Sequence, residues 1–295
     1  MSGMSWIWRA MFRCLCVVGR PMDGIRPRRV YHVVGRRAYR RPAYRWVRNR
    51  WGDELLISPH YHIDRDILAF GCYDPDLHRL LERTIEPGMV CLDVGANLGE
   101  VALHMAGLAG PSGQVWAFEP ASGPFQRLAA HVKRNRKQDI VRCERVALSH
   151  REGECRLFCP KPQADNQGLA SIVNPPSNDC DVEVVRMTTL DQFVAQRRLP
   201  SVDFVKMDVQ GAEHCILSGA GGVLERFRPI MVVEVSGGDL QAAGSDSRKL
   251  CTLVASSGYR LFRLRRNGLG SQVAPGEVPP AWSATNIVCV PWKRG

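Results

Sequence analysis

Residues Val90–Gly99, with the sequence VCLDVGANLG, decide the fold of this chain. An apolar run typical of a strand contains Asp93 near its end and then turns through Gly95 and Gly99. A helix of small and apolar residues is expected to follow, over residues 100–108. In open α/β sheets, a strand, a tight glycine turn and a helix N-terminus together form a binding site for a cofactor.

Three further segments repeat this pattern of an apolar strand that ends in an acid. Glu119 follows the run at 114–118, Asp208 follows the run at 202–207, and Glu234 lies in the run at 229–235. Helical patterns separate these strands, which predicts a doubly wound, mostly parallel sheet of the Rossmann-like class. Because the carboxyl ends of parallel strands share one edge, the four acids are expected to line one crevice.

The turn after Asp93 distinguishes between two classes of cofactor. A dinucleotide site would need G-x-G-x-x-G, whereas this turn is G-x-x-x-G and is preceded by a carboxylate. S-adenosylmethionine has no pyrophosphate, carries an ammonium that suits a carboxylate, and offers two ribose hydroxyls. Glu119 lies 26 positions after Asp93, close to the spacing at which a strand-end acid binds a ribose. The sequence therefore favours S-adenosyl-L-methionine as the cofactor.

Six strings, in this order, resemble FkbM-type methyltransferases, and the resemblance covers roughly residues 55–291. They are LDVGANLG at 92–99, FEP at 118–120, ALS at 147–149, TLDQF at 189–193, VKMDVQGAE at 205–213 and NIVCVP at 286–291. The resemblance implies the class I methyltransferase fold, a seven-stranded sheet whose last strand is antiparallel. It also implies methyl transfer from S-adenosylmethionine, usually to a hydroxyl of a sugar or natural product.

Site residues follow from the resemblance position by position. It implies that the turn beneath the methionine part of the cofactor consists of Gly95, Ala96, Asn97 and Gly99. Glu119 would bind the ribose, with Pro120 beside it, and Val146 or Ala147 would contact the adenine. Asp208 would lie near the methyl group. The string GCYD at 71–74 resembles a Gly-x-Tyr-Glu element of the family, which adds Tyr73 and Asp74. Two positions depart from the family, since Gln210 stands where Glu is frequent and Arg145 where a small polar residue is frequent.

The catalytic candidates are the acids beyond the cofactor turn and one histidine. Asp208 and Glu234 would face the acceptor, and Glu213 would either take part in the reaction or stabilise the start of a helix. Histidine is the usual base for a hydroxyl near neutral pH. His60, His62, His150 and His214 are available, and His214 is preferred because it lies beside Glu213. Nothing in the sequence requires a metal.

The positive charge of the chain is confined to its N-terminus. The net charge is +11, but residues 1–50 contain 13 Arg and one acid, which leaves about −1 for the rest. We expect residues 1–52 to form a poorly ordered basic arm and residues 53–293 to form the methyltransferase domain, with a long loop or lid at 160–180. A helix near residues 5–18 would suit an anionic membrane surface, while a transit peptide and a solvated disordered arm are the alternatives.

The 11 cysteines are scattered and contain no C-x-x-C pair, so a reducing cytoplasm is the expected compartment. The leading hypothesis is O-methylation of a hydroxyl on a sugar, glycan or natural product. One alternative is an RNA methyltransferase that uses the arginine arm, although the nearly neutral body and a misplaced N-P-P-S string at 174–177 count against it. Another is a non-catalytic interaction protein that keeps the fold.

Overall fold

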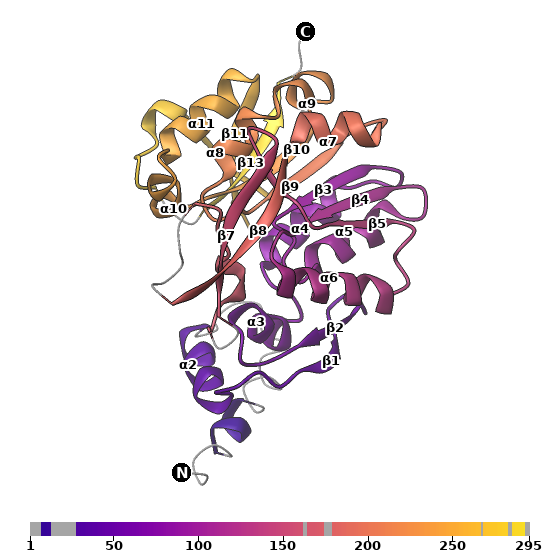
Figure 1. Cartoon of the computed structure of the whole chain (residues 1–295), viewed down its shortest axis with the longest axis vertical. Coiled ribbons are helices and arrows are strands. Elements are labelled where there is room, and N and C mark those ends of the chain that lie inside the picture. Colours follow the sequence, from indigo (N-terminus) through magenta and orange to yellow (C-terminus); the bar gives the residue numbers. More distant parts are fainter. Residues whose placement is uncertain are drawn as a thin grey trace. The chain divides into compact units, whose positions relative to one another are not determined.

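A mixed sheet of eight strands carries Val90–Val94 near its centre (Figure 1). The computed structural model describes residues 7–12, 28–161, 164–173, 179–266, 268–282 and 285–292. Across the sheet the strands follow the order β12 (Gly268–Val273), β11 (Tyr259–Arg265), β13 (Thr285–Pro291), β10 (Ile230–Val235), β9 (Phe204–Met207), β3 (Val90–Val94), β4 (Gln114–Phe118) and β5 (Val141–Glu144).

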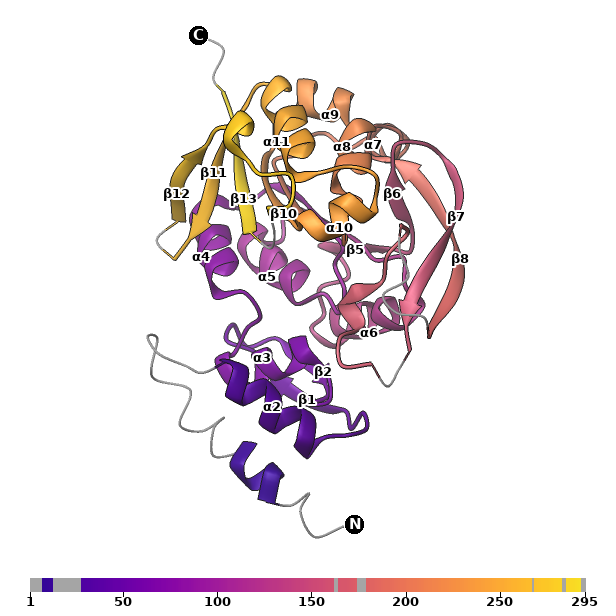
Figure 2. The same cartoon turned by 90° about the vertical axis from the view of Figure 1, so that its left-hand side faces the viewer.

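The topology confirms the predicted class I methyltransferase fold and adds one strand to it. Strands β10, β9, β3, β4 and β5 are parallel, and β13 runs antiparallel to both β10 and β11. The eighth strand, β12, folds back on β11 at the edge of the sheet (Figure 2). Its sequence GLGSQV is polar and glycine-rich, which is why residues 268–273 give no strand signal.

Helices cover both faces of this sheet. They are α4 (Pro75–Thr84), α5 (Glu100–Ala109), α6 (Ser122–Arg134), α7 (Leu190–Arg197), α8 (Glu213–Ser218), α9 (Gly221–Arg226), α10 (Gly237–Ala242) and α11 (Ser247–Ser256). Right-handed crossovers place α5 and α6 on one face and α8, α9 and α11 on the other, because the strand order runs in opposite directions from β3. All five residues of β3 are buried as a result.

A second sheet of three strands follows β5. Its order is β6 (Ala147–Ser149), β8 (Cys180–Thr189) and β7 (Gly153–Pro160). The predicted loop at 160–180 joins β7 to β8 and contains a short 3₁₀ helix at Gln167–Leu169. Its role as a lid stays a prediction, and the N-P-P-S string at 174–177 lies outside the described residues.

The chain divides into two compact units, which are described separately. One comprises Met1–Pro75 with Pro160–Leu169, and the other comprises Asp76–Cys159 with Ala170–Gly295. This division differs from the predicted boundary at residues 52/53, which stays a prediction about domains.

The first unit has its own secondary structure within the segment predicted as an arm. Its elements are a helical segment at residues 7–12, α2 (Arg28–Ala38), β1 (Arg45–Arg48), β2 (Glu54–Ile57) and α3 (His62–Phe70). Phe12, Val34, Ala38, Tyr39 and Ala69 form its buried cluster. Most of the helix predicted at 5–18 lies outside the described residues. In the part of the chain that the structure describes, no helix is long and apolar enough to cross a membrane.

Candidate active site

The four predicted strand-end acids lie on neighbouring strands at the carboxyl edge of the eight-stranded sheet. Strands β10, β9, β3 and β4 are adjacent in that order, and they carry Glu234, Asp208, Asp93 and Glu119 at or just after their ends. The register aligns Val94 with Phe118 and Met207 with Val233, so the residues that follow also lie level with each other. The parallel sheet thus brings together acids that are up to 141 positions apart in the sequence.

The turn after β3 depends on a glycine at position 95. Gly95 has a φ of +77°, and a Cβ placed on it would lie 1.9 Å from the backbone oxygen of Asp208. Any other residue would push the end of β9 away from β3. The amides of Gly95 and Ala96 both donate to the carbonyl of Phe118, and Asn97 adopts a φ of +50° before Gly99 leads into α5. The backbone of this turn is therefore fixed by its neighbours.

Asp93 is paired with a lysine that the sequence analysis did not single out. Asp93 is fully buried, and its Oδ1 lies 3.3 Å from the Nζ of Lys206 on the adjacent strand β9. Lys206 also donates to the carbonyl of Gly95 at 2.8 Å. Burial acts to lower the pKa of Lys206, but the Asp93 and Asp208 carboxylates raise it above its ordinary value, so the lysine stays charged. A lysine inside the apolar run 202–207 was the available sequence signal.

One oxygen of Asp93 is left without a partner. Its Oδ2 is buried and accepts no hydrogen bond of ordinary geometry from a described residue, although the backbone of Ala102 acts to lower the pKa of Asp93. A buried carboxylate oxygen of this kind costs free energy unless a donor reaches it. The position therefore suits a cationic or hydrogen-bond-donating group bound above the turn.

Glu119 is held by two backbone amides. Asn97 N donates to Oε2 at 2.8 Å, and Ala121 N donates to Oε1 at 2.9 Å. Burial raises the pKa of Glu119 to about 7 although both amides act to lower it. Each oxygen keeps further lone pairs, so the carboxylate can accept two hydroxyl hydrogen bonds in a fixed orientation.

A second group of side chains lies beside Lys206. Gln210 donates through Nε2 to Asp208 Oδ1 at 3.1 Å and to Glu234 Oε2 at 3.3 Å. The negative charge of Asp208 and the burial of Glu234 raise the pKa of Glu234 far above its ordinary value. Glu234 therefore keeps its proton near neutral pH. Gln210, which departs from the family pattern, keeps the two acids together.

Glu213 has a structural role in this arrangement. Its Oε1 accepts the amides of Val209 at 3.0 Å and of Gly211 at 3.4 Å, which fixes the turn between β9 and α8. The side chain is 1% exposed, and burial raises its pKa to about 7. A direct part of Glu213 in the chemistry stays a prediction.

His214, the preferred histidine, interacts electrostatically with a different helix. Burial and then the charge of Lys249 lower its pKa, while Asp246 raises it, and both of these residues belong to the start of α11. Asp208 and Glu234 are not among the groups that influence it. A role of His214 as the base stays a prediction.

The remaining predicted contacts are distributed over three places. Val146 and Ala147 are buried at the start of β6, and Pro120 follows Glu119 and accepts a hydrogen bond from Arg145 through its carbonyl. Tyr73 and Asp74 belong to the first unit, just after α3. The adenine contact and the contribution of Tyr73 and Asp74 stay predictions.

The described residues contain one group with the composition of a metal site, in the first unit. His32, His62 and Asp66 bring one potential ligand atom each to within 4.8 Å of the others. The two imidazole rings are stacked at 3.9 Å with an angle of 8° between them, so their lone pairs do not converge on one point. Arg65 also donates to His32 Nδ1 at 3.3 Å, which places a fixed positive charge there. This group behaves as a hydrogen-bonded cluster.

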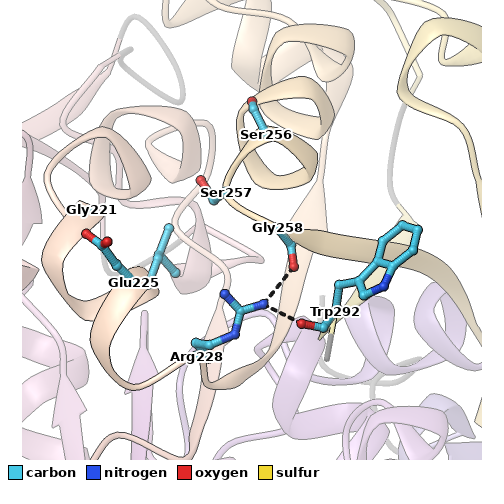
Figure 3. A pocket seen from close by; sticks show the side chains of 8 residues that line it. Gly221, Glu225, Arg228, Ser256, Ser257, Gly258 and Trp292 are labelled. Atoms are coloured by element: carbon cyan, nitrogen blue, oxygen red, sulfur yellow. Dashed lines mark hydrogen bonds between the residues drawn. The ribbon is translucent and has the colours of Figure 1, made fainter. Parts of the chain in front are cut away.

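A pocket of about 400 Å³ lies at the opposite edge of the large sheet (Figure 3). It is lined by Gly221, Leu224, Glu225, Arg228, Ser256, Ser257, Gly258 and Trp292. Arg228 donates to the carbonyls of Gly258 and Trp292, and these contacts tie the α11–β11 turn to the end of β13. No predicted site residue lines this pocket, so we assign it a structural role.

Comparison with known proteins decides the family. Residues 93–261 match the model of the methyltransferase FkbM domain, which is more than half of the chain. The chain belongs to the FkbM methyltransferase family. The match begins at Asp93, extends through β9 and β10 and ends within the first half of β11, so it contains all four strand-end acids.

Three known proteins are similar to this chain. The 2-O-methyltransferase NoeI of Sinorhizobium fredii is 28% identical over 193 residues, which cover 61% of this chain and 77% of NoeI. The hexuronic acid methyltransferase AglP of Haloferax volcanii is 29% identical over 165 residues, covering 56% and 63%. A crystal structure of methyltransferase FkbM from Methylobacillus flagellatus superposes with a TM-score of 0.44 at 14% identity, covering 77% of this chain and 54% of that one. The chain thus spans less than two thirds of the second and third of these proteins.

Proposed function

We propose that this methyltransferase uses S-adenosyl-L-methionine to methylate a hydroxyl group of a sugar, glycan or natural product. The observation that carries the proposal is the geometry of Glu119, whose two oxygens are oriented by the amides of Asn97 and Ala121. A carboxylate held in this way accepts the two hydroxyls of a ribose. The names of NoeI and AglP, a 2-O-methyltransferase and a hexuronic acid methyltransferase, support a hydroxyl acceptor on a sugar.

The residues at the carboxyl edge fit this cofactor. The unpartnered Oδ2 of Asp93 suits the ammonium of the amino-acid part, and Gly95 keeps the turn clear because a side chain there would collide with Asp208. When bound, the cofactor supplies an electrophilic methyl group. The protein then has to orient the acceptor oxygen, and orientation can contribute roughly 7–11 kcal/mol toward the barrier.

We assign the removal of the acceptor proton to Asp208. Its carboxylate is 29% exposed, which leaves it accessible to an acceptor, whereas Asp93 is fully buried. In this assignment Asp208 would accept the hydroxyl proton at a carboxylate oxygen, while the acceptor oxygen would take the methyl group as the methyl–sulfur bond of the cofactor breaks. Glu234 keeps its own proton and donates a hydrogen bond to Asp208, and Gln210 fixes the position of both acids.

We also propose a reducing, cytoplasmic location. In the part of the chain that the structure describes, no disulfide involves Cys91, Cys143, Cys155, Cys159, Cys180, Cys215, Cys251 or Cys289. Burial raises the pKa of Cys91, Cys159 and Cys251 to about 12, which keeps these thiols protonated and unreactive. Free thiols in such number are typical of proteins in reducing compartments.

Calorimetry with S-adenosylmethionine tests the cofactor assignment. The wild-type protein should bind, and Glu119→Gln should weaken binding roughly 10- to 100-fold because it removes charged hydrogen bonds to the ribose. Glu144→Gln is the matched control, since Glu144 ends the next strand, β5, but pairs with Arg197 at 2.7 Å. No binding by the wild type would refute the cofactor, and unchanged binding by Glu119→Gln would refute the ribose contact.

Transfer of a labelled methyl group to a panel of sugars and oligosaccharides tests the base. Asp208→Asn should lower kcat by about 10²–10⁴-fold and leave cofactor affinity nearly unchanged. Glu234→Gln should cost less than about tenfold, because an amide reproduces the donor of a protonated carboxyl. Wild-type kcat in Asp208→Asn would show that another group accepts the proton.

A further inference from the structure

The first unit contains a strongly basic surface segment, residues 36–50, which we call the basic segment. It includes seven arginines, and every one of them is exposed: Arg36, Arg37, Arg40, Arg41, Arg45, Arg48 and Arg50. Residues 24–52 contain no acidic residue. The charge of the whole chain, +11, is thereby concentrated in a short stretch and its N-terminal flank.

These seven arginines differ from other arginines of the chain in their ion pairing. None of the seven forms an ion pair with a residue that the structure describes, whereas arginines elsewhere do so, as in Arg145–Glu183 at 2.6 Å and Arg65–Asp165 at 2.7 Å. Exposed like charges at this density repel one another and attract anions. The segment is therefore electrostatically complementary to an anionic surface.

The basic segment is folded. The end of helix α2 overlaps the basic segment, and the helix is anchored by Val34 and Ala38, which pack against Phe12 and Tyr39. Strand β1 pairs with β2 over four residues, and the amide of Ala43 donates to Ser58 Oγ at 2.9 Å. The arginines thus project from a defined backbone, which lowers the entropy cost of binding a broad surface.

Exposed apolar side chains accompany the arginines and indicate what kind of anionic surface fits. Tyr44, one residue before β1, is 48% exposed, and Trp46 within β1 is 40% exposed. Trp46 lies opposite the partly exposed Leu56 in the hairpin register, and Glu54 opposite Arg48 is the one acid on these paired positions. Val33 in α2 is 48% exposed.

An anionic lipid bilayer interacts favourably with both the arginines and the exposed apolar side chains. Trp and Tyr are enriched at the level of the headgroups, where an apolar ring and a polar edge are both satisfied. Arg binds phosphate oxygens in a bidentate manner. Aliphatic groups such as Val33 and Leu56 gain little on a phosphate backbone, but they can enter the boundary between headgroups and acyl chains.

We propose that the basic segment docks this protein on an anionic phospholipid bilayer, with the arginines on the headgroup phosphates and Trp46 and Tyr44 at the interface. The proposal does not depend on the assigned cofactor or acceptor. Its consequence for the enzyme is that acceptors carried on lipids would be encountered at the membrane surface.

Co-sedimentation of the full-length protein with vesicles tests this docking. Vesicles of phosphatidylcholine that contain about 30% of the anionic lipid phosphatidylglycerol should bind the protein, and vesicles of pure phosphatidylcholine should not. The double variant Arg45→Gln with Arg48→Gln should bind the vesicles about fivefold more weakly for each arginine removed. A higher salt concentration should also weaken vesicle binding. Arg226→Gln with Arg260→Gln is the control for charge, because both arginines are exposed on the second unit, and it should bind as the wild type does.

Trp46→Ala separates interfacial docking from simple charge attraction. It should weaken vesicle binding at both low and high salt while circular dichroism and the unfolding midpoint stay unchanged. Equal binding to charged and neutral vesicles, or wild-type binding by the Arg45/Arg48 variant, would overturn the proposal. Binding to a short RNA in preference to the anionic vesicles would overturn it in favour of a nucleic acid partner.

Discussion

Charged side chains are buried at the carboxyl edge of the large sheet, whereas they are exposed in the basic segment. At the sheet edge the charges are buried, so each needs a specific partner: Asp93 has Lys206, and Glu119 has two backbone amides. In residues 36–50 the charges are exposed and have no ion-pair partner among the described residues. Buried charges are strong and specific, because water does not screen them, whereas exposed charges act weakly and collectively. This difference predicts a descending order of mutational effects.

The largest effect is expected from Lys206→Met. It leaves Asp93 buried without its counter-charge, so the free energy of unfolding should fall by about 3–5 kcal/mol. Urea denaturation measures the change. Lys249→Met is the control, since Lys249 is 62% exposed in its pair with Asp246, and should cost less than about 0.5 kcal/mol.

The double variant Asp93→Asn with Lys206→Met sharpens this prediction. It removes both buried charges, so a large part of the lost stability should return, although cofactor binding should not. Equal stability of Lys206→Met and wild type would show that the pair is not a buried ion pair.

A change in pH is expected to have an intermediate effect on the free energy of unfolding. Burial raises the pKa of Glu119 and of Glu213 to about 7, so the folded protein without cofactor binds protons that the unfolded chain has released. Stability should therefore fall as the pH rises from about 4.5 to about 7, by up to roughly 3 kcal/mol for each group.

Urea denaturation of the wild type and Glu119→Gln at pH 5 and pH 8 measures this effect. The variant should lose stability at both values because its amide nitrogen faces a backbone N–H, but its dependence on pH should be flatter. An identical slope in the two proteins would mean that Glu119 does not titrate in this range.

The smallest effect is expected in the basic segment. Arg36→Gln with Arg37→Gln should change the free energy of unfolding by less than about 0.5 kcal/mol, with a slight gain at low salt from reduced repulsion. Cofactor affinity, measured by calorimetry, should not change. A loss of more than about 2 kcal/mol would show that these arginines support the fold.

Much of the fold could be predicted because its signals are local. The apolar run Val90–Val94, the glycines at 95 and 99 and the amphipathic pattern of Pro75–Ile85 each specify their own conformation. The edge strand β12 was missed since Gly268 and Gly270 lower its strand propensity, and it forms only by pairing with β11. Within residues 28–52 the helix α2 was also missed, because its many arginines hide a narrow apolar stripe at Val34 and Ala38.

The sequence by itself determined which acids meet, because strand ends are encoded locally and parallel strands share an edge. Only the tertiary structure decided how those acids are used. Lys206 reaches Asp93 across 113 positions, and Gln210 joins Asp208 to Glu234, because the register of β9 between β3 and β10 sets these side chains opposite each other. His214 lies beside Glu213 in the sequence, but the charged groups that act on its pKa, Lys249 and Asp246, lie at the start of α11. Local pattern fixes where a strand stops, whereas pairing between distant segments fixes which partner a buried charge receives.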